Sequence, residues 1–153
     1  PELATQSNRA IITMQRGRTW LLSLADWEIG LATDLPWEIL LSTFLGEISG
    51  DLRGLIIDKA HFATGLGDIH LIAPDRPSGP IAIRSALGNI HLTVPASMEA
   101  CLTVRAGPLF NAHIDSSRWQ PDGDNRYVTP GYRDAVEPLE LTIGGTFGGL
   151  TLA

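Results

Sequence analysis

His70 and His91 come closer than any other pair of residues in this sequence to a spacing that could do chemistry. Each histidine follows the same kind of turn, LGDIHL at 66–71 and LGNIHL at 87–92, and the two lie 21 residues apart. If these segments stack as neighbouring strands, the two imidazoles lie about 4.8 Å apart and could share a metal ion. A metal site would then need a third ligand at an equivalent position.

The neighbouring copies of this segment supply no such ligand. Ser49 and Thr151 occupy the equivalent position in the flanking copies, and His61 and His113 fall elsewhere in the pattern. We therefore expect His70 and His91 to form an exposed row of side chains, and we assign no metal-binding residue.

Acidic and amide residues align directly after a repeated glycine. Asp26, Glu47, Asp68 and Asn89 could form a column that attracts Ca²⁺, but the sequence lacks the Gly-Gly-x-Gly-x-Asp spacing of calcium-binding repeats. Residues of these types favour tight turns, which is the role that we expect for them. The sequence therefore predicts no cofactor.

No arrangement of nucleophiles or carboxylates indicates an active site. Ser42, Ser85 and Ser116 all lie outside a Gly-x-Ser-x-Gly motif, and the glycines at 65 and 67 precede a strand instead of the helix of a dinucleotide site. Cys101 lies in an apolar, strand-like segment, where a small buried residue is expected. We predict that the chain is not an enzyme, and we assign no catalytic residue.

Composition limits the classes of partner. The 153 residues include 11 Lys and Arg against 17 Asp and Glu, which gives a net charge of −6, and the basic residues are scattered. We expect no nucleic-acid partner, because phosphate binding needs a basic face.

No run approaches the roughly 20 apolar residues of a membrane helix, so we expect no membrane span within the chain. Because the chain begins at Pro1, we expect that an N-terminal segment has been removed or lies outside it.

A repeat of 21 residues organises the segments that carry the two histidines. Three copies, at 39–48, 60–69 and 81–90, share a leucine, the glycine after it and an isoleucine two residues further on: Leu45, Leu66 and Leu87; Gly46, Gly67 and Gly88; Ile48, Ile69 and Ile90. Degraded copies lie at 24–27, 101–110 and 141–150, the last with Phe147-Gly148 in place of Leu-Gly. Apolar residues alternate before each glycine, which is strand periodicity.

Constant spacing predicts stacked coils, because stacking places equivalent residues above one another. A β-sandwich with evenly spaced hairpins is the alternative. We predict an all-β, single-domain β-solenoid over 1–153, with coils of about 21 residues, right-handed winding, and the repeat at 18–110 and 138–153. Gly46, Gly67, Gly88 and Gly148 are the expected structural turns, since glycine adopts positive φ freely.

The leucine and isoleucine columns are expected to fill the interior of the stack. A charge at Leu66 or Ile69 should then unfold the domain, whereas a charge at Ser49 or His70 should be tolerated.

The repeat is interrupted by an insertion at 111–137. Its density of Pro, Gly, Asp and Asn indicates a long surface excursion. Trp119, Tyr127 and Tyr132 could supply aromatic contacts to a partner, which makes this segment a candidate interaction loop. The alternative is that these aromatic residues pin the insertion onto the solenoid.

The sequence resembles the toastrack and LiaF-like C-terminal domains of bacterial envelope proteins over about 20–153. The resemblance rests on the LGDIHL and LGNIHL segments, the proline that ends each coil, the NRY and GYRDA segments of the insertion, and the closing LELTIGGTFGGLTL. It implies a non-enzymatic domain of a membrane or envelope protein, linked with stress sensing or protein interaction. The chain departs from that family's usual form because it lacks the membrane helices, which leaves membrane attachment open. The expected location is the bacterial cell envelope or its membrane, with neither side of the membrane assigned.

Three functional hypotheses follow. The first is a protein-interaction or scaffold domain that binds a protein partner through a sheet face, a solenoid end or the insertion. The second is a self-assembling structural subunit of a larger complex or filament, similar to bactofilins, because the ends of a solenoid expose unpaired strand edges. The third is a carbohydrate-active β-solenoid enzyme, although such enzymes are usually longer and carry clustered acidic residues.

Overall fold

The computed structural model describes residues 2–6, 9–13 and 28–153, and the weak repeat expected at 24–27, which includes Asp26, lies outside these ranges. The chain divides into two compact units, 1–30 and 31–153. In the first unit β1 (Glu2–Gln6) and β2 (Arg9–Thr13) pair antiparallel. All regular elements in the described ranges are strands, which confirms the all-β prediction. The single domain expected over 1–153 stays a prediction.

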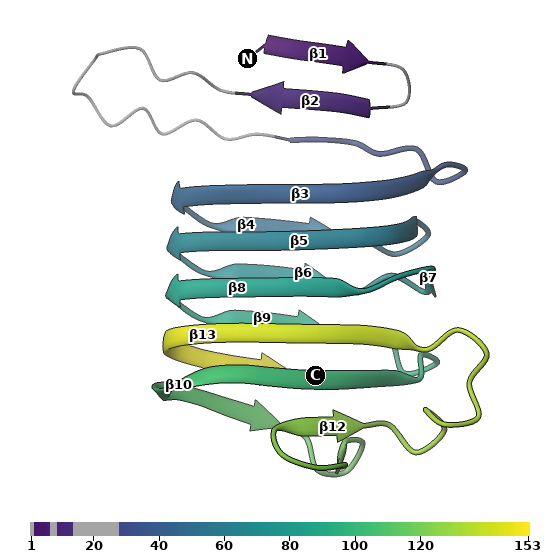
Figure 1. Ribbon diagram of the computed structural model, residues 1–153, viewed down its shortest axis with the longest axis vertical. Coiled ribbons are helices and arrows are strands. Elements are labelled where there is room, and N and C mark those ends of the chain that lie inside the picture. The colour runs from purple at the N-terminus through teal and green to yellow at the C-terminus, as the bar shows by residue number, and fades with distance from the viewer. Residues whose placement is uncertain (1, 7–8, 14–27) are drawn as a thin grey trace. The chain divides into compact units, whose positions relative to one another are not determined.

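The second unit consists of strands in two rows (Figure 1). The first row holds β3 (Pro36–Leu45), β5 (Ile56–Leu66), β8 (Ile81–Leu87), and the first parts of β10 (Ala100–Ile114) and β13 (Leu139–Leu152). The second row holds β4 (Ile48–Asp51), β6 (Ile69–Ile72), β9 (Ile90–Thr93), and the ends of β10 and β13. The short strand β7 (Arg76–Pro77) pairs with β5 on the return path between the rows.

Neighbouring coils are in register along the repeat. Leu45 pairs with Leu66 and Leu66 with Leu87 in parallel strands, and Ile69 lies between its counterparts in the second row. The predicted solenoid of stacked coils is therefore confirmed. Its right-handed winding stays a prediction.

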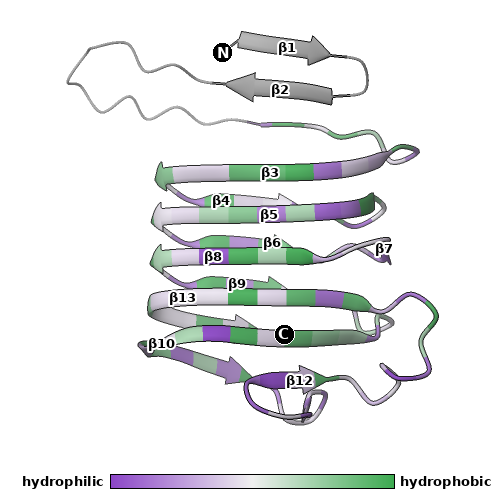
Figure 2. Cartoon of the chain, in the orientation of Figure 1, coloured by the Kyte–Doolittle hydropathy of each residue, from purple (hydrophilic) through white to green (hydrophobic). Residues whose placement is uncertain are grey.

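The interior between the two rows is apolar. Buried and more exposed residues alternate along β6 and β9, as the periodicity predicts. Figure 2 shows the apolar residues distributed along both rows of strands. Ile69, Ile83, Ile90 and Ile143 are fully buried. Each such side chain contributes about 1.5–3 kcal/mol to folding, so the isoleucine columns are a main source of stability.

The leucine column departs from the expectation. Leu45, Leu66 and Leu87 lie where the long strands end, and Leu66 is 38% exposed whereas Ile69 is 0% exposed. The prediction that leucines fill the interior was wrong, because the glycine that follows turns the chain at once and leaves the last side chain of the strand at the rim of the core.

The four expected turn glycines form one column at this corner. Gly46, Gly67, Gly88 and Gly148 have φ of +134°, +139°, +146° and +117°, a region that side chains disfavour. A Cβ built on Gly67 would also overlap the carbonyl oxygen of Gly46, and the same overlap recurs between Gly88 and Gly67 and between Gly148 and Gly88. Stacking thus requires glycine for a second reason, since adjacent corners touch through their backbones.

The coils do not stack in chain order. Taken in sequence, the repeat would place the 100–110 copy beside β8 and β9, but β13 lies there, and β10 pairs with the far side of β13. The reason lies at the corner: β13 brings Gly148 next to Gly88, whereas β10 has Phe110 at this position. β10 also has a register shift between Ala106 and Leu109, which makes its corner irregular.

Candidate functional site

The expected interaction loop at 111–137 closes one end of the stack. Its first residues continue β10, and its strands β11 (Gln120–Pro121) and β12 (Arg126–Val128) pair with each other. β12 also pairs antiparallel with β10. Trp119 is 2% exposed and belongs to the apolar core. Tyr127 is partly buried and packs against this core. Trp119 is therefore not available to a partner, and the arrangement matches the alternative in which aromatic residues pin the insertion.

Arg118 fixes the start of the insertion. Its guanidinium donates hydrogen bonds to the carbonyl oxygens of Val94 at 2.6 Å, Pro95 at 2.6 Å and Met98 at 2.9 Å. Charged donors make stronger hydrogen bonds than neutral ones. This contact holds the insertion against the turn that leads from β9 to β10.

Tyr132 lies in a polar network on the other side of the insertion. Its hydroxyl donates a hydrogen bond to Glu140 Oε1 and accepts one from Arg126, which also donates to Cys101 Sγ at 3.1 Å and to Asp122 at 2.7 Å. The hydrogen bond to Glu140, then burial and the charge of Glu140, raise the pKa of Tyr132 to about 12. Cys101 is buried, as expected. The network ties the insertion to β10 and β13.

The second row presents a polar outer surface that we call the histidine face: Glu47, Ser49, Asp68, His70, Asn89, His91, Asn111, His113 and Thr151. The rings of His70 and His91 stack with centroids 4.6 Å apart and an interplanar angle of 6°. This stacking confirms the expected row of histidines. A ligand atom from Asp68 lies within 4.8 Å of those of both histidines.

His113 also belongs to the histidine face, which the sequence pattern did not indicate. His91 pairs with Thr151, and Thr151 pairs with His113. The expectation that His113 falls elsewhere was wrong, because position 110 was not recognised as a corner. Counting three residues from that corner, as from Gly88 to His91, would have found it.

A strip of apolar side chains runs along the corner between the two rows. This corner ridge consists of five residues that pair in successive strands: Leu45, Leu66, Leu87, Phe147 and Leu109. They are between 38% and 60% exposed. At about 4.8 Å per strand, the ridge is about 19 Å long. A continuous apolar strip of this kind is a common feature of interaction sites.

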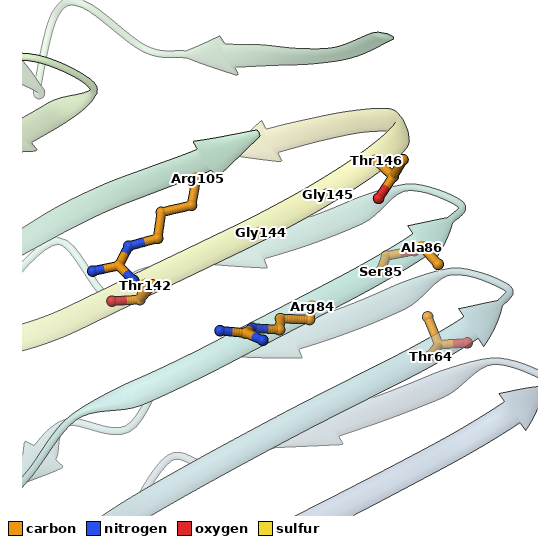
Figure 3. A pocket seen from close by; sticks show the side chains of 9 residues that line it. All are labelled: Thr64, Arg84, Ser85, Ala86, Arg105, Thr142, Gly144, Gly145 and Thr146. Atoms are coloured by element: carbon orange, nitrogen blue, oxygen red, sulfur yellow. The ribbon is translucent and has the colours of Figure 1, made fainter. Parts of the chain in front are cut away.

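A shallow hollow of about 400 Å³ lies beside the ridge on the first row (Figure 3). Arg84 and Arg105 line it from either side of Gly144, which leaves a gap because it has no side chain. Figure 3 shows both guanidinium groups directed toward the same end of the strands. Two guanidinium groups can bind carboxylates on a partner through charged hydrogen bonds.

Within the described ranges, no helix is long and apolar enough to cross a membrane.

No protein-family model and no curated protein matches the sequence. Among solved structures, the crystal structure of a "putative cell adhesion protein" from Clostridium sporogenes superposes with a TM-score of 0.69 at 20% identity. The match covers 80% of this chain and 57% of that protein. The likeness shows the fold alone. This chain thus spans little more than half the length of its structural neighbour.

Proposed function

We propose that this chain contains a non-enzymatic protein-interaction domain of a bacterial envelope-associated protein, similar to the LiaF-like and toastrack domains. The observation that carries the proposal is the corner ridge. The ridge side chains are 38% to 60% exposed, so burial of one of them on binding contributes about 1 kcal/mol, part of the value for a fully exposed leucine. The ridge can therefore supply the apolar centre of an interface, and its surroundings must supply the rest.

The surroundings of the ridge indicate the chemistry of its partner. Ala86 and Thr146, which precede the ridge residues Leu87 and Phe147, line the arginine hollow. Interfaces combine an apolar centre with a polar rim, and arginine is enriched in them. The partner that fits is a protein with an apolar strip flanked by carboxylates. The cell-adhesion description of the structural neighbour supports a surface interaction role of this kind.

Affinity capture from an envelope extract of the source organism tests the ridge. The double variant Leu66→Ser, Leu87→Ser removes two half-exposed side chains, and Lys59→Ser, an exposed change elsewhere on β5, is the matched control. We expect a protein that the unchanged chain and the control retain, and that the ridge variant loses by tenfold or more, which corresponds to about 1.4 kcal/mol. Equal capture by the ridge variant would contradict the proposal.

The non-enzymatic part of the proposal has its own test. A broad hydrolase screen, including polysaccharide substrates, should give no turnover above the background. Turnover that a single substitution abolishes would show an enzyme instead.

A second candidate function, self-assembly, is favoured by β3. Within the described residues this strand pairs with β5 alone, and its Leu40 and Phe44 are 76% and 75% exposed. Open strand edges with apolar side chains recruit further strands. Light scattering after size-exclusion chromatography separates the candidates: a mass that rises with concentration, and that Phe44→Lys returns to the monomer, would support assembly. A concentration-independent monomer would exclude it.

A further inference from the structure

Three ligand-bearing side chains converge on the histidine face, apart from the corner ridge. We propose that Asp68, His70 and His91 bind a divalent transition-metal ion, with Zn²⁺ as the representative ion. The ligand atoms of the three residues lie within 4.8 Å of one another. This site goes beyond the proposed protein interaction and does not depend on it.

The backbone places the three residues on one surface. Asp68 directly precedes β6 and His70 lies in it, on either side of the fully buried Ile69. Because neighbours of a buried strand residue point the other way, both side chains reach the outer surface. His91 pairs directly with His70 in the next strand. Because the buried isoleucines lock the register of β6 and β9, the three ligands are held together by the core.

Hydrogen bonding orients the carboxylate. Asp68 Oδ1 accepts a hydrogen bond of 2.7 Å from the backbone N–H of Asn89. Its Oδ2 has no hydrogen-bond partner in the described part of the chain. Contacts that fix one oxygen of a ligating carboxylate are typical of metal sites, because they orient the other oxygen toward the ion.

The two imidazoles must reorient to share an ion. A ring nitrogen binds a metal ion through the lone pair that lies in the ring plane, and Zn–N bonds are about 2.0–2.1 Å long. In this structure the rings are stacked with centroids 4.6 Å apart and an interplanar angle of 6°, so their lone pairs lie in nearly parallel planes. Binding therefore requires side-chain rotations that turn both ring planes toward a common point and break the stack. The His70 side chain is 43% exposed, which leaves it room to tilt.

The structure supplies three protein ligands to this site. Glu47 Oε1 lies 3.8 Å from His70 Nε2 but on the side of His70 away from His91, so it is not placed to reach an ion held between the two histidines. Two imidazole nitrogens with one carboxylate suit Zn²⁺ and neighbouring transition metals, whereas Ca²⁺ and Mg²⁺ prefer oxygen ligands throughout.

Isothermal titration of the full chain, without a histidine tag, with ZnCl₂ near neutral pH tests the site. We expect one ion per chain. His70→Asn, His91→Asn and Asp68→Asn should each weaken binding by tenfold or more, since at metal sites even the loss of a partner that orients a ligand weakens binding ten- to a hundredfold. The matched control is His61→Asn, a change on β5 in the other row, which should leave binding unchanged.

Nuclear magnetic resonance of the unchanged chain provides a test that no variant's folding can affect. On addition of Zn²⁺ the ring signals of His70 and His91 should shift together, and those of His61 should not. The proposal is overturned if no binding occurs up to about 1 mM Zn²⁺. A dissociation constant of about 1 mM corresponds to a binding free energy of about −4 kcal/mol. Undiminished binding by any of the three variants, His70→Asn, His91→Asn or Asp68→Asn, would also overturn the proposal.

Discussion

The ring of Phe110 occupies the space that a side chain at position 145 would need. A Cβ built on Gly145 would overlap Cδ2 and Cε2 of that ring, which is buried. The two residues belong to β10 and β13, which pair in parallel although an insertion separates them in the chain. Phe110 thus fills the core at the corner where the other coils have glycine.

We expect Gly145→Ala to destabilise the domain by about 2–4 kcal/mol, because the methyl group and the Phe110 ring cannot both fit. Gly144→Ala is the matched control, since its Cβ would lie 3.4 Å or more from its neighbours. Chemical unfolding of Gly145→Ala, Phe110→Leu and the double variant measures the coupling. The double variant should be more stable than the sum of the single effects indicates; additive effects would disprove the packing relationship.

A negative charge should have very different effects at two positions of the repeat that lie three residues apart. Ile69→Asp places an unpaired charge in a fully buried site and should cost about 4 kcal/mol or more. Leu66→Asp, at a half-exposed corner, should cost about 1 kcal/mol. Urea unfolding followed by circular dichroism checks both values. Similar losses for the two variants would mean that the leucine column is part of the core after all.

The spacing of the repeat was enough to predict the solenoid, the register and the stacked histidines, because equivalent residues in stacked coils must align. Coil order could not be predicted in this way. The copies share the same strand periodicity, so the periodicity does not tell which copy lies beside β8. The difference lies in one corner residue: Gly148 can approach the carbonyl of Gly88, whereas Phe110 has a side chain at this position.

The candidate metal site was only partly predictable. Sequence spacing brings His70 beside His91, but it assigned Asp68 to a turn and left it out of the ligand set. Its side chain lies near the histidines because the chain is already extended just before β6 and the backbone N–H of Asn89 in the next coil holds Asp68 Oδ1. The buried position of Trp119 depends on long-range packing of the insertion, for which local composition carries no signal.

Alanine should be tolerated less well at Gly67 than at Gly46. Both have positive φ, but a Cβ on Gly67 would overlap the Gly46 carbonyl, whereas a Cβ on Gly46 would meet Thr43 Oγ1 at 3.8 Å. We expect Gly46→Ala to cost about 1–2 kcal/mol from backbone strain and Gly67→Ala clearly more. Thermal unfolding of both variants gives the comparison. Equal losses would show that φ alone determines the need for glycine.

Tyr132 should make the stability of the domain fall at high pH. Its pKa is raised from about 10 to about 12, chiefly by the hydrogen bond that it donates to Glu140. The folded state therefore holds the phenol proton after the unfolded chain has lost it. This contribution to stability is complete below about pH 10 and is lost as pH rises toward about 12.

The Tyr132→Phe variant has no phenol proton to lose. The difference in free energy of unfolding between the unchanged chain and this variant should therefore become smaller as the pH rises from about 10 to about 12. Urea unfolding at several pH values between about 8 and 12 measures the difference. Glu140→Gln provides the control: it removes the carboxylate and should return the pKa of Tyr132 toward its usual value of about 10. A difference between unchanged chain and Tyr132→Phe that stays constant with pH would show that Glu140 does not hold the proton on Tyr132.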